Sequence, residues 1–276
     1  MASGRHQLLP SLGAFAWPAI LVSAGFFVIP MGFIAIYTAG EDRSFLEGIR
    51  EVASSNLVFR VFMNTLEISA TAAIVSVCLA YPVALHVMRQ SRIWKAICLT
   101  LILVPFWTSI LVKSYAFIVI LGDRGLINTI LQSGLGLEGL NMMFNRFAVI
   151  VGMTNFLVPF AIFPILASLS AQNQAIQSAA DVMGASPLRV FWSITFPQSL
   201  PGVFAALLMC LVISMGFFVT PALLGGRQDM MMANIIDLYT REILDWQSAS
   251  LIALLLLVFC GGVSAAILKL QTAAGR

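Results

Sequence analysis

The sequence contains few charged residues: 12 acidic and 15 basic side chains make up 10% of its 276 residues. A soluble domain typically carries about 25% charged residues. One soluble core of this size could not hide the 60% of residues that are hydrophobic, whereas lipid can. The net charge of +3 is small and spread out, so it gives no indication of a nucleic-acid partner. The composition therefore predicts an integral membrane protein.

Cysteine and histidine are equally scarce, with four and two copies. Each cysteine lies inside an apolar run, none forms a CxxC pair, and no histidine is near one in sequence. We interpret the cysteines as small packing residues and expect no disulfide and no metal site. An intramembrane enzyme would need catalytic groups such as HExxH or paired aspartates on a span, and neither is found. The cysteines are Cys78, Cys98, Cys210 and Cys260.

Long apolar stretches are abundant, and about 20 such residues are enough for a helix to cross the hydrocarbon core. These spans must be helical, because lipid offers backbone polar groups no water to bond. The first stretch is too long for the core of a signal peptide, so we expect a retained span. The sequence predicts one membrane domain over residues 1–276, with spans at about 17–37, 63–87, 96–122, 147–169, 202–224 and 247–268.

Orientation follows from the basic residues between the spans. They divide evenly between the two sides, so their number alone does not decide. The short connection 88–95, however, carries three basic residues and no acid, which is typical of a cytoplasmic loop. We therefore expect both termini in the cytoplasm, together with the long loop 170–201.

This loop, residues 170–201, is predicted to form two short helices at 172–183 and 188–195. Gly184 favours a helix stop between them, since glycine tolerates the left-handed conformation. Ser186 is placed to cap the second helix, and Pro187 lies where the first-turn amide is not needed. We expect that helix to stop by Pro197, with Pro201 separating it from the fifth span. On local physics alone, a plain connector and a docking element both remain open.

The motif in this loop favours docking. Residues 178–184 read SAADVMG and residues 194–197 read ITFP. This resembles the EAA loop of binding-protein-dependent ABC permeases, whose pattern is Glu-Ala-Ala, three residues, Gly, nine residues, Ile, one residue, Leu-Pro. The spacing is intact, while Ser178 replaces the glutamate and Phe196 the leucine. Four further segments look like the spermidine/putrescine-type branch, which also includes importers of amino-acid-like and opine compounds. They are PFWTS at 105–109, KSYA at 113–116, GLIN at 125–128 and TPALLGG at 220–226.

The resemblance implies an all-α, type I ABC importer-like fold of six transmembrane helices, with a cytoplasmic coupling loop between the fourth and fifth. It implies a bacterial inner-membrane permease without a catalytic site or cofactor of its own. A dimeric ATPase would bind ATP and Mg, and a second homologous six-span permease, identical or, as is usual in this branch, distinct, would complete the path. An external solute-binding protein would deliver a polyamine or related amine or amino-acid-like solute. The small residues of the motif would contact the ATPase. The expected coupling residues are Ala179, Ala180, Asp181, Gly184, Ala185 and Pro187.

Candidate residues for the solute path carry charge or aromatic rings. On a straight third span Lys113 would lie about 26 Å from Ala96, near the outer interface. Glu67 is about one turn from the outer end of its span, so the two would pair structurally or line an outer vestibule. Phe106, Trp107 and Tyr115 form an aromatic wall for an ammonium group or are ordinary membrane aromatics.

Acidic residues before the sixth span complete this set. Asp245, with Asp237 and Glu242, would suit a cationic solute or form a solvated loop face. An ion-gradient-driven secondary transporter without an ATPase is the alternative function. It would need polar sites near the midplane and often repeated halves, which the sequence does not show.

Overall fold

The computed structural model describes residues 10–39 and 45–274. Every regular element within these ranges is a helix, and the predicted all-α class is confirmed. By length and composition, five helices are suited to cross a membrane, or six when one bent pair counts as a single span. The elements are α1 (Pro10–Ala39), α2 (Phe45–Ser54), α3 (Asn56–Met88), α4 (Arg92–Leu103), the 3-10 turn η1 (Val104–Trp107), α5 (Ile110–Leu121), α6 (Leu126–Leu135), α7 (Arg146–Ser170), α8 (Gln174–Val182), α9 (Pro187–Val190), the π-helical turn η2 (Phe191–Thr195), α10 (Phe196–Met215), α11 (Val219–Leu224), α12 (Met232–Leu238), the π-helical turn η3 (Tyr239–Ile243) and α13 (Trp246–Ala274).

Helices α3, α7 and α10 form the centre of the bundle, and each packs along the other two. Small side chains let the helices approach closely, since Ala72 and Ala80 of α3 are fully buried. At Gly202 of α10, an added Cβ would lie 2.6 Å from the carbonyl oxygen of Pro164 in α7. Lipid provides no hydrophobic force between helices, so close packing of small residues holds the bundle together.

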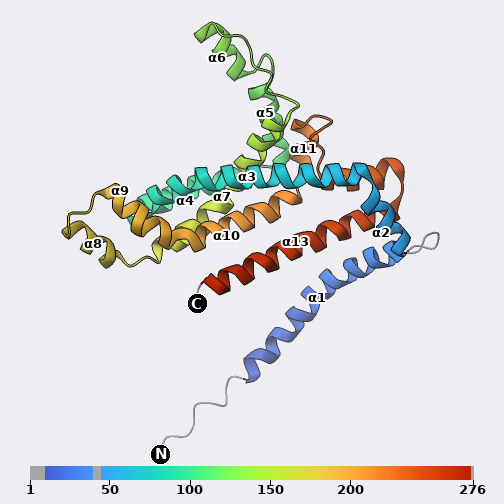
Figure 1. Cartoon of the computed structure of the whole chain (residues 1–276), viewed down its shortest axis with the longest axis horizontal. Coiled ribbons are helices and arrows are strands. Elements are labelled where there is room, and N and C mark those ends of the chain that lie inside the picture. The colour runs from blue at the N-terminus through green and yellow to red at the C-terminus, as the bar shows by residue number, and fades with distance from the viewer. Residues whose placement is uncertain (1–9, 40–44, 275–276) are drawn as a thin grey trace, which may run out of the picture.

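Helices α1 and α13 lie outside this centre. Figure 1 shows α13 beside α10. It also shows α1 moving away from the bundle toward its own N-terminal end. α1 touches α13 and α2, and none of its most apolar 18-residue window is buried within the chain. Side chains such as Phe26, which is 81% exposed, therefore face lipid or another protein.

The third predicted span, 96–122, is not one continuous helix, and this expectation was wrong. α4 and η1 cover Arg92–Trp107, and after a break the chain continues at 92° to its first direction. Pro105 in η1 has no N–H to donate, and Thr108 adopts an extended backbone with ψ of 135°. As a result α5 and α6 project from the bundle as an arm that is seen clearly in Figure 1.

The boundary predicted between the coupling loop and the fifth span was also wrong. One continuous helix runs from Pro187 through η2 to Met215, without a stop at Pro197 or Pro201. In η2 the N–H of Phe196 donates to the carbonyl of Phe191, five residues back. This π-helical register carries the chain past Pro197, which lacks a donor of its own. The helix then ends before residue 224, because Gly216 terminates α10 and α11 forms separately.

Candidate functional site

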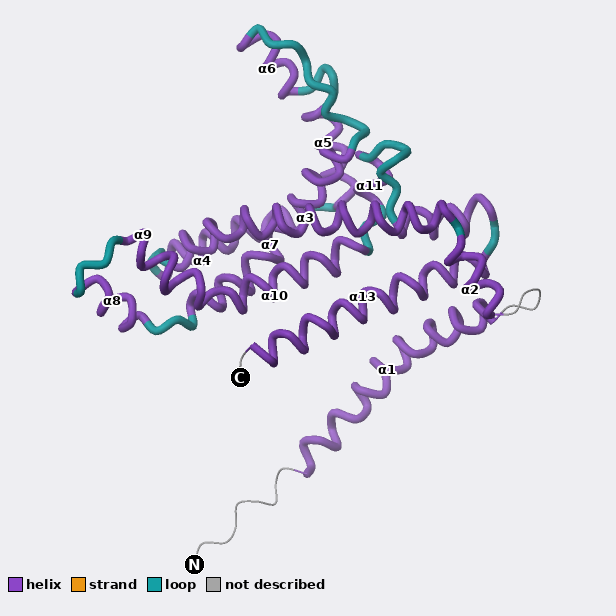
Figure 2. The backbone as a smooth tube through the Cα atoms, in the orientation of Figure 1, coloured by secondary structure: helices purple, strands orange, loops and turns teal. Residues whose placement is uncertain are grey.

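The pair of short helices at one end of the bundle is the first part of the candidate site. Figure 2 shows α8 and α9 with their connecting loops extending beyond the ends of α3, α7 and α10. The side chain of Asn173 accepts a hydrogen bond from the N–H of Ala175 at 3.0 Å and so caps the first turn of α8. Gln172 donates through Nε2 to the carbonyl of Thr195 at 2.9 Å, which fastens the start of the loop to its end.

The turn between α8 and α9 is set by Gly184, whose φ is +79°. The N–H of Ala185 donates to the carbonyl of Ala180 at 3.0 Å, which is the six-to-one bond of a Schellman motif. The predicted helix stop is confirmed. Ser186 stands at the N-cap position of α9 with Pro187 following, but its side chain makes no capping hydrogen bond.

The predicted coupling residues lie around this turn. Ala179, Gly184 and Pro187 are exposed, and Ala180 and Ala185 are half-buried. Asp181 belongs to α8, but its side chain is outside the part of the chain that the structure describes. The motif did not point to three large apolar side chains beside them. Val182, Met183 and Leu188 are 89%, 85% and 70% exposed. Their apolar character in an otherwise polar loop could have identified them from the sequence. An exposed apolar cluster of this kind is typical of an interaction surface.

Aromatic residues tie this end to the bundle. The hydroxyl of Tyr81 on α3 lies 2.8 Å from Oγ of Ser199 on α10. The ring of Tyr81 meets Phe196 edge-on at 5.7 Å and Phe191 at 6.0 Å between centroids. Trp192 packs on Phe196 at 5.3 Å. The continuous helix from Pro187 is therefore fixed to α3 just where it enters the bundle.

A second aromatic cluster lies near the middle of the bundle. Phe106 contacts Phe160 at 5.4 Å, and Phe156 contacts Phe217 at 5.2 Å and Phe160 at 5.4 Å. Nζ of Lys113 lies 5.7 Å from the centroid of Phe156. Of the predicted aromatic wall, only Phe106 joins this cluster. Trp107 and Tyr115 are 86% and 59% exposed, and no ring contact joins them to it within the described residues.

Lys113 lies closer to the middle of the bundle than a straight third span would place it. The 26 Å estimate assumed a straight helix, whereas the chain turns aside at Thr108, about 18 Å from Ala96 along the helix. Phe156, which Lys113 overlies, is ten residues into α7, or about 15 Å from its start. Since the hydrocarbon core is about 30 Å thick, both estimates place Lys113 near the midplane. An ionisable residue at that depth is usually functional.

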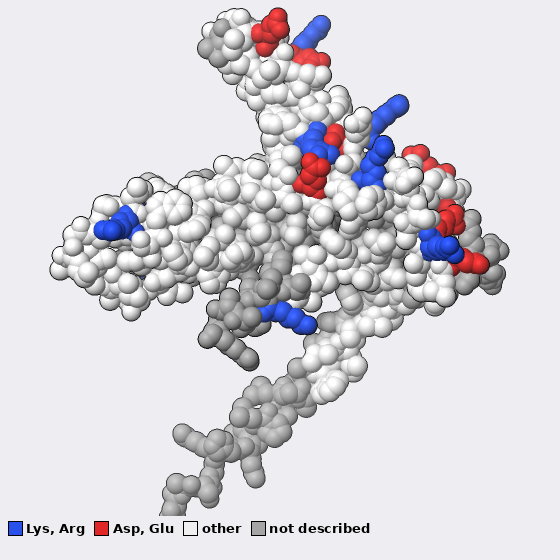
Figure 3. Space-filling view, in the orientation of Figure 1, with Lys and Arg blue, Asp and Glu red and all other residues white. Residues whose placement is uncertain are grey.

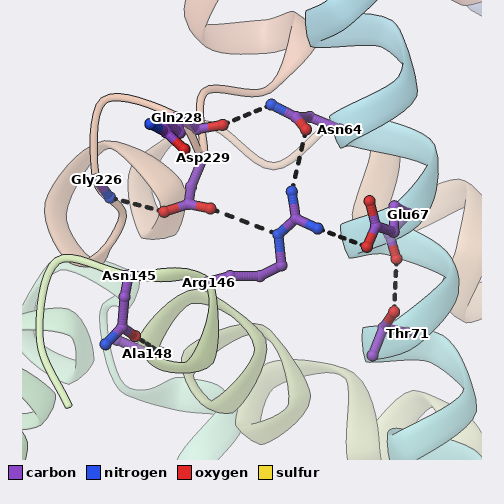
Figure 4. Close-up of polar contacts among 9 residues, drawn as sticks. All are labelled: Asn64, Glu67, Thr71, Asn145, Arg146, Ala148, Gly226, Gln228 and Asp229. Carbon is purple, nitrogen blue, oxygen red and sulfur yellow. Dashed lines mark hydrogen bonds and ion pairs between the residues drawn. The ribbon is translucent and has the colours of Figure 1, made fainter. Parts of the chain in front are cut away.

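Glu67 does not pair with Lys113. It forms an ion pair of 2.5 Å with Arg146, the first residue of α7, which the sequence analysis did not select. Nε of Arg146 lies 3.5 Å from Asp229, and its NH2 nitrogen donates to Asn64 at 3.0 Å. Figure 4 shows one guanidinium reaching acceptors on α3 and on the loop after α11.

This polar network fixes the loop at 225–231 against the bundle. Asp229, whose side chain is 10% exposed, also accepts from the N–H of Gly226 at 3.1 Å. Asn64 donates to the carbonyl of Gln228 at 2.5 Å. Figure 3 shows charged side chains gathering at this end and on the arm, with few on the flank of the bundle. The network therefore joins α3, α7 and the loop at the end opposite α8 and α9.

Asp245 has a structural position. It accepts from the N–H of Ser248 at 3.0 Å and from its hydroxyl at 2.7 Å, and so caps the first turn of α13. Its predicted neighbour Asp237 pairs with Arg241 at 2.7 Å. Among the residues that the structure describes, no group of three or more His, Cys, Asp or Glu is arranged to hold a metal ion.

Long apolar helices, an exposed helical pair at one end and a polar network at the other define a multi-pass membrane permease. The sequence profile of one family covers residues 73–271. The chain belongs to that family, the inner membrane components of binding-protein-dependent transport systems, and is a permease subunit of an ABC importer.

Individual relatives agree with this assignment. The spermidine/putrescine transport system permease protein PotB of Escherichia coli K12 is 29% identical over 206 residues, 74% of this chain and 75% of that protein. PotB of Haemophilus influenzae is 30% identical over 181 residues, 65% of this chain and 63% of that protein. A crystal structure of a bacterial ABC transporter that imports the acidic polysaccharide alginate shares the fold, with a TM-score of 0.81, 19% identity and coverage of 96% of each chain.

Proposed function

We propose that this chain forms half of the translocation path for a small amine, such as a polyamine, and that a separate ATPase dimer drives it through α8 and α9. The observation that carries this proposal is the continuous helix from Pro187 to Met215. A force applied at α9 acts directly on a central helix of the bundle, because no flexible joint separates them. A rigid two-state element that nucleotide can bias is the physical requirement for coupling.

The exposed end of this helix suits a protein groove. Val182, Met183 and Leu188 provide apolar contact area, while the small side chains of Ala179 and Ala185 let a partner's backbone approach. ATP binding closes the ATPase pair, the groove moves α8 and α9, and the aromatic contacts of Tyr81 carry the motion into α3. This end and both termini are then cytoplasmic, and the Arg146 network faces outward.

A second six-span permease completes the path. The arm of α5 and α6 stands away from the bundle (Figure 1), and several of its apolar side chains are uncovered, with Val119 71% exposed and Val112 59%. A groove of about 680 Å³ also runs beside α3 and α7, and it is lined by Thr154 and Asn155 among apolar residues. Asn155 is exposed about 13 Å along α7, so its amide faces the bilayer core unless another subunit covers it.

The solute class is supported by chemistry as well as by the names of relatives. The E. coli and H. influenzae relatives are spermidine/putrescine permeases. In this chain the alkylammonium of Lys113 already rests on the face of Phe156 near the midplane, within the reach of a cation–π contact. The same face is chemically suited to the ammonium of a passing amine. External delivery would come from a solute-binding protein.

The test is to purify the chain in mild detergent with nucleotide and identify its partners by mass spectrometry. The recovered complex is then reconstituted in liposomes, and ATP hydrolysis is measured with putrescine and candidate solute-binding proteins. We expect an ATPase and a second six-span subunit to co-purify, and hydrolysis to rise when the solute is delivered. Solute movement by the isolated chain without ATP would instead establish an ion-driven carrier.

A further inference from the structure

A hollow of about 360 Å³ lies beside the Arg146 network. It is formed between the first three turns of α3, the start of α7 and the loop after α11. Three guanidinium groups line it, from Arg60, Arg146 and Arg227, together with the polar side chains of Asn64 and Gln228. No acidic side chain is among the residues that line it.

The three arginines differ in how they are paired. Arg146 is committed to Glu67, Asp229 and Asn64. Arg60 and Arg227 are exposed, and over residues 10–39 and 45–274 neither has a carboxylate partner. Within the described residues, the hollow therefore has two cationic groups without an ion-pair partner, and Arg227 also borders a neighbouring hollow that Asp237 and Glu242 line.

The backbone that carries Arg227 is fixed on both sides. Gly226 donates to the carboxylate of Asp229, and the carbonyl of Gln228 accepts from Asn64. Arg60 extends from α3, one turn before Asn64 on the same helix. A guanidinium on a fixed backbone presents a fork that matches a carboxylate, and this preorganisation is the usual basis of bidentate recognition.

We propose that the hollow binds an acidic side chain of the external solute-binding protein. This inference rests on the proposed function, which places the hollow on the outer side. Charge excludes the amine solute as occupant, because unpaired arginines repel it. The volume holds a glutamate or aspartate side chain with several waters, each of which occupies about 30 Å³ in the liquid.

The experiment uses the complete transporter in nanodiscs of uncharged lipid, with the solute-binding protein that stimulates its ATP hydrolysis. Affinity of that protein is measured for Arg60→Gln/Arg227→Gln, for Arg60→Lys/Arg227→Lys and for Arg50→Gln. Arg50 is exposed on α2 at the same end but outside the hollow, so Arg50→Gln controls for the loss of one positive charge elsewhere on this face. The affinity of each variant is measured at about 0.05 M and at about 0.5 M salt, because the screening of charges is much stronger at the higher concentration.

We expect the glutamine pair to weaken binding roughly tenfold at low salt, with little difference at high salt, because rim charges act through association and screening. The lysine pair keeps the positive charge, so it should lose less affinity than the glutamine pair. Arg50→Gln should bind the solute-binding protein as the wild type does. Unchanged affinity of the glutamine pair overturns the proposal. A loss confined to the solute-loaded protein also overturns it, since the carboxylate would then be the solute's.

The two proposals fail in different ways. If no external protein stimulates the wild-type transporter, the proposed function is wrong and this inference falls with it. If the wild type is stimulated and the glutamine pair responds equally, only the hollow's role is wrong.

Discussion

Tyr81 on α3 and Ser199 on α10 share a hydrogen bond of 2.8 Å at the point where the continuous helix from Pro187 enters the bundle. Ser199 donates its own proton to the carbonyl of Phe196, also at 2.8 Å, so the phenol of Tyr81 is the donor. Ser199 is fully buried. The phenol therefore joins two central helices within the first turn of α10, just after the π-helical turn η2 ends.

Replacing Tyr81 separates the roles of its hydroxyl and its ring. Tyr81→Phe removes one donor and is expected to lower the free energy of unfolding by about 1 kcal/mol, with transport retained. Tyr81→Ala also removes the edge contacts with Phe191 and Phe196, so uptake per ATP hydrolysed should fall several-fold. Thermal unfolding in detergent and the uptake-to-hydrolysis ratio in liposomes measure the two effects. Normal coupling in Tyr81→Ala would show that the ring does not transmit motion.

Substitutions of Gly184 test the docking role of the turn between α8 and α9. An added Cβ would meet no atom within 4 Å, so only the backbone conformation at φ +79° restricts this position. Gly184→Glu is expected to cost about 1 kcal/mol of local strain, to add charge at the docking surface and to uncouple transport while membrane insertion stays normal. Gly184→Asn, which adopts the left-handed region more readily, should retain most uptake. The test measures uptake at matched expression, and normal uptake by the glutamate variant would count strongly against the docking role.

Arg146 is expected to be more important for stability than either of its acidic partners. Arg146→Met leaves Asp229 with a single hydrogen bond in a nearly buried position, which should cost about 1–3 kcal/mol. Glu67→Gln should cost much less, because the side chain of Glu67 is 62% exposed. Adding Asp229→Asn to Arg146→Met should recover part of the loss, which a double-mutant cycle by thermal unfolding detects. Equal costs for the two single variants would contradict this ranking.

The midplane aromatic cluster predicts how uptake responds to its members. Phe156→Leu removes the cation-binding face and should raise the KM for putrescine roughly twofold to thirtyfold. Lys113→Met removes a like charge from the same face, so uptake at low putrescine concentration should increase. Phe33→Leu is the matched control, since Phe33 is 59% exposed on α1. A rise in KM for all three variants would point to general destabilisation, and an unchanged KM in Phe156→Leu would exclude the ring from the path.

Hydropathy was sufficient to locate the apolar runs, because a charge-free stretch such as 147–169 has few alternatives to a membrane helix. It could not reveal the turn at Thr108, since the residues on both sides are equally apolar and a membrane helix need not be amphipathic. The π-helical turn was hidden for a related reason. Pro197 usually ends a helix, and only the three-dimensional register shows how the chain passes it.

The site shows the same limit. The loop motif placed Gly184 correctly because its role is local, set by one backbone angle. The partner of Glu67 was missed because Arg146 is 79 residues away in sequence and lies at the edge of a predicted span. Contacts that depend on which helices are neighbours require the bundle, and spacing along the chain does not contain that information.

The sideways turn at Thr108 has a consequence for biogenesis. A chain that turns out of its own bundle at this point leaves the rest of that span unfilled, and much of the arm stays uncovered unless the proposed second permease packs against it. A copy without its partner therefore leaves the arm and the amide of Asn155 in contact with lipid, and we expect membrane proteases to degrade it faster than the assembled subunit. Abundance of this subunit should follow the supply of its companion rather than its own rate of synthesis.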